Sequence, residues 1–313
     1  PMQIAYQNKP LCGELELFDA HDTPTIAVTG TNGKSTTVAL GAHLVDALGR
    51  KSFAGGNLGQ PLIEWLDSGE SADVVVAELS SFQLETAYRF AADVGVVLNV
   101  SPDHADRYDS FAAYVEAKAT LIQNLKKGSH AVLNADCPVV SKMGQASSAS
   151  VLWFGEHKQA IPGPGLLIEG KKLIPVNQFS GLEEINVDAQ HLEGTHNMQN
   201  AAAACLACAV LFPNEKALSE KLEKAMKTFQ GLEHRMEFVG EFSGVKFYND
   251  SKATNDHAAA VAVAAMRKPT LLLAGGVSKD GGYEYLSNAL SSGVKKILAF
   301  GQARFELEEA FAD

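Results

Sequence analysis

A short glycine-rich loop near the start of the chain carries the clearest chemical signal. The loop consists of Gly30, Thr31, Asn32, Gly33, Lys34, Ser35 and Thr36. Glycines let backbone N–H groups approach phosphate oxygens, and the N-terminus of a following helix adds partial positive charge. Lys34 would reach the β- and γ-phosphates of a nucleotide, and the Ser35 hydroxyl would bind Mg²⁺. The G-x-x-G-K-S spacing is shorter than the usual G-x-x-x-x-G-K-[ST], so a glycine turn with a solvated lysine is the alternative.

Polar side chains follow two further apolar runs. Glu78 lies near the end of the run Val74–Leu79, and Asp103 and His104 follow the run Val94–Val100. Carboxylates at the C-terminal ends of parallel strands, beside a phosphate loop, are well placed to hold Mg²⁺. The alternatives are a solvated acid for Glu78 and helix capping for Asp103, although capping does not explain the histidine.

Four other positions have plain structural explanations. Lys118 stands in the middle of a helical pattern, and the residues alone predict an exposed helix lysine. Asn197 and Asn200 are three residues apart at the start of another helix, so they share a face, but capping would also explain them. Arg235 either reaches toward a nucleotide or forms a surface salt bridge.

The elements that must position these residues are short apolar strands alternating with helices. Strands are predicted at 25–29, 74–79, 94–100, 131–134, 271–274 and 297–300, and helices at 34–48, 111–127, 196–211, 215–229 and 303–312. Continuous Val/Ile/Leu runs between helices predict an α/β fold with a parallel sheet covered on both faces. The Gly- and Pro-rich stretch 151–179 predicts a small antiparallel excursion, with a hairpin at 166–168 and 173–176. Gly231 marks a predicted domain boundary, and a second, smaller α/β unit follows it.

Five blocks of sequence resemble the Mur ligase family, and within it the D-glutamate-adding ligases. The blocks are Thr29–Ser35, Glu78–Glu85, Asn99–Tyr108, Gly194–Asn200 and Asn249–Asn255, and they occur in the order of the family. The resemblance implies a P-loop ATPase-like central domain at 13–231 and a truncated, Rossmann-like, amino-acid-binding domain at 232–313. It also implies that 1–12 is the remnant of an N-terminal domain that binds the uridine nucleotide.

The resemblance further implies a reaction. A Mur ligase of this type joins D-glutamate to UDP-N-acetylmuramoyl-L-alanine through an acyl phosphate, using ATP and two Mg²⁺ ions, in peptidoglycan precursor biosynthesis. Lys34, His104 and Lys118 are then catalytic, and Ser35, Glu78, His104 and a carbamylated Lys118 are metal ligands. The P-loop residues with Asn197, Asn200, Arg235 and Asp250 would bind ATP. The positions assigned to the other substrates are Asn57, Ser80, Gln83, Lys252, Thr254 and Lys279, the last of which meets the D-glutamate carboxylate.

Composition limits the remaining possibilities. The 313 residues carry a net charge of -11, which argues against nucleic-acid binding because that depends on Lys and Arg. The longest nearly apolar run, 201–212, is short of the ~20 residues that span a bilayer. Four scattered cysteines are too few for a disulfide framework, and the C-x-x-C pair Cys205 and Cys208, in an Ala-rich run, predicts buried core thiols rather than a metal or redox site. We therefore expect a cytoplasmic monomer that acts on small molecules.

Two rival functions stay open at this stage. One is another Mur or folylpolyglutamate-type ligase, against which the blocks at 78–85 and 249–255 argue. The other is a P-loop switch or ATPase that forms no amide bond.

No signal peptide opens the chain, and because it begins with Pro1 we expect residues to precede it.

Overall fold

The structure, a computed structural model, is built around one large sheet. It describes residues 12–19, 21–57, 59–104, 107–189, 192, 194–266, 268–277, 282–290 and 293–311. The strands of the sheet are β1 (Thr25–Thr29), β2 (Ser52–Gly56), β3 (Val74–Glu78), β4 (Val94–Val97), β5 (His130–Asn134), β6 (Ser150–Gly155), β7 (Gly165–Glu169), β8 (Lys172–Val176) and β9 (Ile185–Asn186). Their spatial order is β2-β3-β1-β4-β5-β6-β7-β8-β9. The predicted parallel sheet is therefore confirmed, with β1 an interior strand between β3 and β4.

The Gly- and Pro-rich stretch differs in part from its prediction. β6 pairs parallel with β5, and β7 pairs parallel with β6, so the parallel sheet continues into this stretch. Only β8 runs opposite to the rest of the sheet: it pairs antiparallel with β7, as the predicted hairpin, and antiparallel with β9 on its other side. A short 3₁₀ turn, η1 (Lys158–Ala160), lies between β6 and β7 and helps reverse the chain so that β7 can return parallel. The hairpin thus extends the main sheet and is not a separate excursion.

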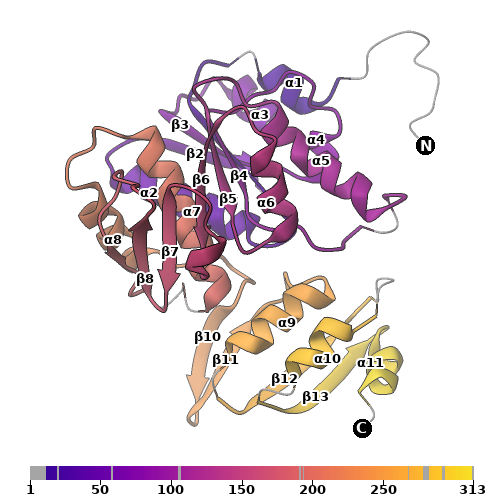
Figure 1. The fold of residues 1–313 in the computed structure, drawn as a ribbon. Coiled ribbons are helices and arrows are strands. Elements are labelled where there is room, and N and C mark those ends of the chain that lie inside the picture. The colour runs from indigo at the N-terminus through magenta and orange to yellow at the C-terminus, as the bar shows by residue number, and fades with distance from the viewer. Residues whose placement is uncertain are drawn as a thin grey trace, which may run out of the picture.

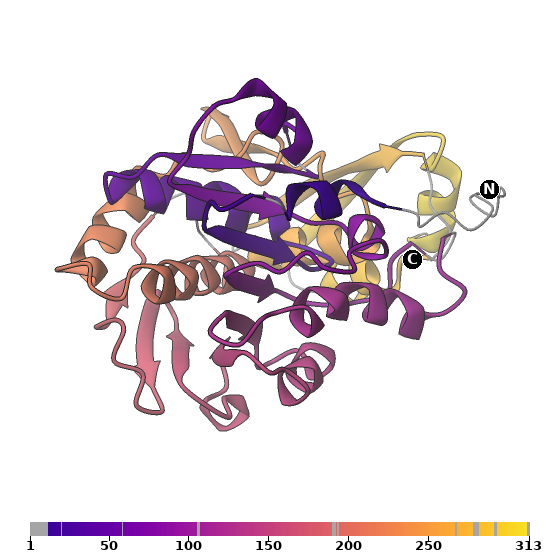
Figure 2. The same ribbon diagram turned by 90° about the horizontal axis from the view of Figure 1, so that it is seen from above.

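Helices cover both faces of the sheet, as predicted (Figures 1 and 2). One face carries α2 (Lys34–Ala47), α7 (Thr195–Leu211) and α8 (Leu218–Thr228). The other carries α1 (Glu14–Phe18), α3 (Leu62–Ser68), α4 (Ser81–Leu84), α5 (Phe111–Gln123) and α6 (Pro138–Gln145). Successive strand residues point to opposite faces, so Ile26 and Val28 join the first core and Ala27 joins the second.

Two helices are shorter than their patterns predicted, for local reasons. α5 ends at Gln123, and Asn124, its C-cap, donates its side-chain amide to the carbonyl of Ala87 at 3.0 Å. α8 begins at Leu218 because Ala217 has a left-handed backbone, with φ 52°.

Cys205 and Cys208 on α7 are fully buried, which confirms the prediction of core thiols. Within the described ranges, no helix is long and apolar enough to cross a bilayer.

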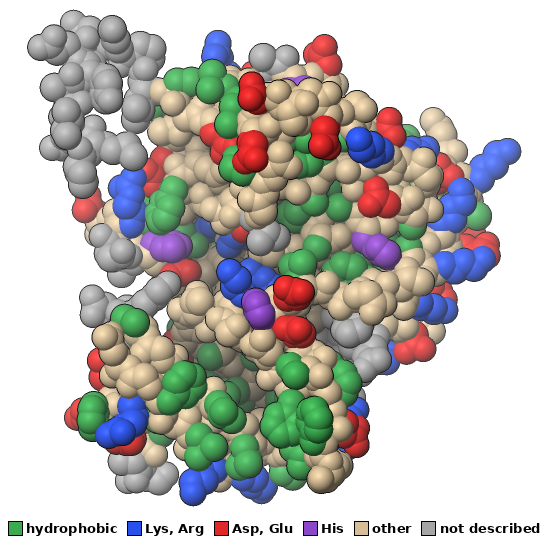
Figure 3. Space-filling view, turned by 180° about the vertical axis from the view of Figure 1, so that it is seen from behind, with side chains coloured by type: hydrophobic (Ala, Val, Ile, Leu, Met, Phe, Trp, Pro, Cys, Tyr) green, Lys and Arg blue, Asp and Glu red, His purple; other side chains and the backbone are tan. Residues whose placement is uncertain are grey.

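A second unit follows α8 and contains two small sheets. β10 (Glu237–Phe242) and β11 (Val245–Asn249) form an antiparallel hairpin, and β12 (Thr270–Gly276) pairs parallel with β13 (Val294–Gly301). The helices of this unit are α9 (Asp256–Ala265), α10 (Glu284–Leu290) and α11 (Arg304–Ala310). Large hydrophobic side chains are exposed on its strands, and Figure 3 shows them gathered on this part of the molecule. They include Val239, Phe242, Val245, Phe247, Leu271, Leu273, Leu298 and Phe300.

Candidate functional site

The glycine loop lies between the C-terminal end of β1 and the N-terminus of α2. Gly33 caps α2 with a left-handed backbone of φ 87° and no side-chain capping bond. A Cβ at Gly33 would lie 2.4 Å from Asn200 Oδ1, so only glycine fits there without a shift. The first-turn N–H groups of α2 thus receive no side-chain cap from Gly33, which leaves a helix terminus suited to an anion.

A neighbouring loop fixes the backbone of the glycine loop. Asn99 follows β4, and its side chain accepts from the Asn32 N–H at 2.8 Å and donates to the Asn32 carbonyl at 3.0 Å. The Asn99 carbonyl also accepts from the Thr31 N–H at 2.9 Å. Asn99 was not among the candidate residues, although a polar residue near the end of the apolar run Val94–Val100 was a signal for it. The P-loop is therefore held rigid before any ligand arrives.

The side chain of Lys118 is buried, which corrects the prediction of an exposed helix lysine. Lys118 is 2% exposed because α5 packs this face against the P-loop. Its Nζ donates to the Gly30 carbonyl at 2.9 Å and lies 4.7 Å from the centroid of the Tyr114 ring. Burial, with the neighbouring Lys34 ammonium, lowers the pKa of Lys118 well below its usual value. A buried lysine of this kind is readily neutral, and a neutral amine is the form that reacts with electrophiles.

Lys34 extends back over its own loop. Its Nζ donates to the carbonyls of Gly30 and Thr31 at 2.9 and 2.8 Å. Burial lowers the pKa of Lys34, and the carboxylate of Glu78 opposes that shift. An ammonium has three N–H donors, and these two bonds leave one for a phosphate oxygen.

Glu78 offers an oxygen suited to a cation. The residue is 3% exposed at the end of β3, and Asn57 Nδ2 donates to its Oε1 at 2.9 Å. Its Oε2 is buried and has no hydrogen-bond partner. Because a buried carboxylate oxygen without a donor is costly, this atom fits a Mg²⁺ ligand. Nowhere in the described ranges do three His, Cys, Asp or Glu side chains gather as a ready metal cage, and Mg²⁺ commonly uses one or two carboxylates plus phosphates.

His104 has an unusual backbone beside this carboxylate loop. Its φ is +55°, in the left-handed region that non-glycine residues rarely adopt. Its carbonyl accepts from the N–H groups of Arg107 and Tyr108 at 3.0 and 3.1 Å. Its own N–H donates to Asp103 Oδ1 at 2.9 Å. The surrounding loop therefore determines where the imidazole lies.

The second unit contacts the P-loop directly. Arg235 Nη2 donates to Ser35 Oγ at 2.8 Å, so Arg235 contacts the predicted metal ligand, and no carboxylate in the described part of the chain pairs with it. His257 Nδ1 lies 3.0 Å from Asn32 Nδ2, and Asn255 Nδ2 donates to Asp103 Oδ2 at 3.3 Å. These contacts join residues more than 150 positions apart in the sequence.

A cavity of about 290 Å³ lies at this junction. Its lining from the first unit includes Asn32, Gly33, Thr36, Asn134, His196, Asn197 and Asn200, and its lining from the second includes Arg235, Asp250, Lys252 and His257. Asn197 and Asn200 are buried, and Asn200 Nδ2 donates to Asn197 Oδ1 at 3.2 Å. Burial lowers the pKa of His196 to about 4 and raises the pKa of Asp250. The cavity thus opens directly onto the phosphate loop, and neutral amides line it there.

Comparison with known proteins gives this arrangement a family. The model of the Mur ligase middle domain matches residues 28–208. The chain belongs to the Mur ligase family. It is 39% identical over 301 residues to the UDP-N-acetylmuramoylalanine–D-glutamate ligase of Syntrophus aciditrophicus, covering 96% of this chain and 65% of that protein. It is 38% identical over 304 residues to the ligase of the same name from Geotalea daltonii, covering 96% and 65%.

Solved structures of Mur-type ligases share the fold. The pseudomurein peptide ligase type C of Methanothermus fervidus has a TM-score of 0.68 at 20% identity, covering 94% of this chain and 68% of that one. The MurF ligase of Thermotoga maritima, in complex with ADP, has a TM-score of 0.69 at 16% identity, covering 96% and 75%. The chain spans 65% of the length of the two curated relatives above.

In this Mur ligase chain, the residues predicted to bind the other substrates lie in different environments. Asn57 contacts Glu78, as described, and Lys252 lines the cavity. Ser80 and Gln83 bond to each other in a capping box at the start of α4, and Gln83 Nε2 also donates to Glu14 Oε2 at 3.0 Å. Thr254 is exposed and is not part of the cavity lining, and Lys279 lies outside the described residues. The substrate roles of these residues stay predictions.

Proposed function

We propose that this Mur ligase chain binds ATP and Mg²⁺ and ligates D-glutamate to UDP-N-acetylmuramoyl-L-alanine in peptidoglycan precursor synthesis. The observation that carries the proposal is the arrangement around the Gly30 carbonyl. The Nζ atoms of two lysines, the half-buried Lys34 and the buried Lys118, donate to that carbonyl, in a chain 39% identical to a D-glutamate ligase. Residues 13–231 form the nucleotide-binding domain of this proposal, and residues 232–313 contribute to the site of the amino acid.

The nucleotide occupies the junction between the two units. Its phosphates meet the P-loop N–H groups and the free donor of Lys34, and its base and ribose enter the cavity beside Asn197, Asn200 and Asp250. Arg235 already reaches Ser35 at 2.8 Å, so its guanidinium is close enough to the loop to contact a phosphate. The side chains present therefore supply cations where ATP carries negative charge.

Two transfers make the amide bond. An oxygen of the L-alanine carboxylate attacks the γ-phosphorus, the bond to the β-phosphate oxygen breaks, and ADP leaves. The amine of D-glutamate then attacks the acyl carbon, the carbon–oxygen bond to phosphate breaks, and the amine loses a proton. The products are the lengthened peptide, ADP and phosphate. The Lys34 ammonium stabilises negative charge on the transferring phosphoryl group, and no side-chain nucleophile is needed.

Ser35, Glu78, His104 and a carbamylated Lys118 would hold Mg²⁺. When bound, Mg²⁺ neutralises charge on the phosphoryl oxygens. The unpartnered Oε2 of Glu78 supports the site, and the burial of Lys118 supports carbamylation. A neutral amine adds CO₂, and the resulting carbamate replaces a cation with oxygen ligands.

A phosphate-release assay separates this function from its rivals. The assay uses a protein that contains this sequence and has the full length of the curated relatives. We expect rapid release only when ATP, UDP-N-acetylmuramoyl-L-alanine and D-glutamate are all present. Release with ATP alone would identify a nucleotide switch or ATPase. Release that depends on diaminopimelate or lysine, or on glutamate together with a folate acceptor, would identify another ligase.

A further inference from the structure

We infer that Phe82, Glu85 and Arg107 form a positioning device that holds the His104 imidazole toward the metal site. None of the three was assigned a role from the sequence. The inference rests on the proposed function, because it concerns how that function's metal ligands are held in place.

The first part of the device is an aromatic contact. The Phe82 ring lies on the first turn of α4, with its centroid 4.9 Å from the His104 ring at an interplanar angle of 60°. It also stacks on Tyr108 at 6.0 Å and 20°. The Tyr114 ring, on α5, has its centroid 6.1 Å from that of His104. Aromatic rings from two different helices therefore lie beside the imidazole, which restricts its rotation.

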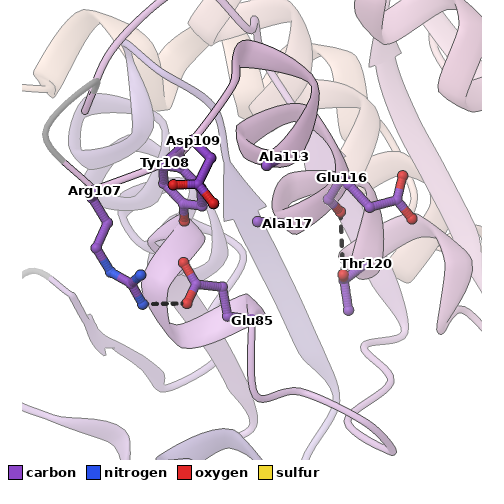
Figure 4. Close-up of a pocket in the computed structure, with 8 residues that line it drawn as sticks. All are labelled: Glu85, Arg107, Tyr108, Asp109, Ala113, Glu116, Ala117 and Thr120. Carbon is purple, nitrogen blue, oxygen red and sulfur yellow. Dashed lines mark hydrogen bonds and ion pairs between the residues drawn. The ribbon is translucent and has the colours of Figure 1, made fainter. Parts of the chain in front are cut away.

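The second part is an ion pair that joins two loops. Arg107 Nη2 donates to Glu85 Oε2 at 2.6 Å, as Figure 4 shows. Glu85 is the C-cap of α4, which follows the loop of Glu78, whereas Arg107 lies three residues after His104. The pair thus ties the loop after β3 to the loop after β4. These are the two loops that carry the proposed metal ligands Glu78 and His104.

The third observation is backbone strain at the residue being held. His104 has φ +55°, a strained conformation that persists only when its surroundings enforce it. The backbone N–H groups of Arg107 and Tyr108 both donate to the His104 carbonyl. The Arg107 guanidinium also lies 5.8 Å from the ring centroids of Phe82 and Tyr108. Arg107 therefore contacts the strained residue through its backbone and the flanking rings through its side chain.

These contacts act on position more than on stability. The side chains of Arg107 and Glu85 are 48% and 25% exposed, and an ion pair at such a surface adds little to folding. Partners that orient a metal-binding histidine, by contrast, commonly change metal affinity by roughly 10- to 100-fold. Loss of the device should therefore weaken metal binding far more than it lowers thermal stability.

The test uses this chain with ADP and Mn²⁺ as a paramagnetic probe for Mg²⁺. Electron paramagnetic resonance measures the affinity for Mn²⁺ in the presence of ADP, and calorimetry measures ADP binding in a metal chelator. We expect Phe82→Leu and Glu85→Gln to weaken Mn²⁺ binding roughly tenfold and to leave metal-free ADP binding unchanged. Phe82→Tyr, which keeps the aromatic ring, should retain the Mn²⁺ affinity of the wild type.

A matched control and a second measurement separate the possible outcomes. Glu184→Gln removes another exposed ion pair, the 2.7 Å contact with Lys172, and should change nothing. Nuclear magnetic resonance of the His104 ring protons, assigned with His104→Gln, should show the loss of a ring-current shift in Phe82→Leu. Unchanged Mn²⁺ affinity and unchanged His104 shifts in both variants would overturn the inference alone. No Mn²⁺·ADP binding by the wild-type chain would overturn the proposed function and the inference with it.

Discussion

Lys34 and Lys118 donate through Nζ to the same acceptor, the carbonyl oxygen of Gly30, each at 2.9 Å. The two residues come from different helices, α2 and α5, and Lys118 is buried whereas Lys34 is half-buried. Two ammonium charges at one carbonyl are unfavourable unless an anion compensates them, and burial together with Lys34 accordingly lowers the pKa of Lys118 well below its usual value. The relationship therefore points to a ligand with concentrated negative charge, as the phosphates of ATP have, and to a carbamate on Lys118.

Lys34 can be tested through nucleotide affinity. Lys34→Ala should weaken ATP·Mg²⁺ binding by roughly 10- to 100-fold, because hydrogen bonds to charged groups contribute about 1.5–3 kcal/mol. The fold should survive, since the bonding partners of Lys34 are carbonyls of its own loop. Titration calorimetry measures the change, and Lys172→Ala, at an exposed ion pair, is the control. Wild-type affinity in Lys34→Ala would remove this lysine from the phosphate site.

Lys118 can be tested by chemical rescue. Lys118→Ala should inactivate the full-length ligase, and bicarbonate should not restore it, because no amine is left to carbamylate. A short carboxylic acid should restore part of the phosphate release by supplying oxygens to Mg²⁺. The expected thermal stability is no lower than that of the wild type, because the substitution removes a buried amine. Full activity without any added acid would show that Lys118 has only a structural role.

Gly33 is expected to tolerate no side chain. Gly33→Ala meets two penalties, a left-handed backbone of φ 87° and a contact of 2.4 Å with Asn200 Oδ1. Gly49→Ala is the matched control, because Gly49 has φ 77° and no atom within 4 Å of the added carbon. Both variants pay about 1–2 kcal/mol for the backbone, and Gly33→Ala should lose more. Urea unfolding gives the two values, and equal losses would contradict the close approach of Asn200.

Glu16 should make the stability of the chain depend on acid. Burial opposes ionisation of Glu16, but hydrogen bonds from Arg89, Phe90 and Tyr88 outweigh it and lower its pKa to about 2. Because the pKa is depressed in the folded state, Glu16 adds stability above its ordinary pKa of 4.5, and that stability is lost as the pH falls toward 2. Over that window the loss is about 3 kcal/mol. Glu16→Gln should flatten the slope of unfolding free energy against pH between 4.5 and 2, whereas Glu64→Gln, at an exposed position, should keep it.

Arg235 should couple the two units of the chain. Its bond to Ser35 at 2.8 Å joins the second unit to the P-loop. Arg235→Gln should weaken ATP binding roughly tenfold or more, through the loss of a charge-assisted contact. It should also increase proteolysis of the connection between α8 and β10. Limited proteolysis with and without ATP measures this, and identical cleavage in both proteins would contradict the coupling.

The sheet and the P-loop could be predicted because each has a local signal. Runs such as Val74–Glu78 are buried on both faces, so a short, continuous, Val-rich run between helical patterns indicates a parallel strand. The β10–β11 hairpin also had a sequence signal that was overlooked, the turn-forming pair Ser243 and Gly244. In the structure these two residues have φ values of 52° and 79°, as the turn of a two-residue hairpin requires.

The burial of Lys118 had no such signal. Alanines lie on several faces of α5, so no apolar stripe shows which side of Phe111–Gln123 packs inward. The contact of Lys118 with Gly30 spans 88 positions and exists only in the folded chain. The hydrogen bond between Asn99 and Asn32 is non-local in the same way, because the two residues are 67 positions apart. Local patterns predict elements, whereas the site depends on how distant loops meet.

The central claim, ligation through an acyl phosphate, can be tested by following a single oxygen atom. UDP-N-acetylmuramoyl-L-alanine labelled with ¹⁸O in its carboxylate is incubated with ATP, Mg²⁺, D-glutamate and the full-length protein, and the products are analysed by mass spectrometry. We predict a UDP-linked product lengthened by D-glutamate, together with inorganic phosphate that carries one ¹⁸O atom. Unlabelled phosphate, or labelled substrate recovered without D-glutamate attached, would contradict the account.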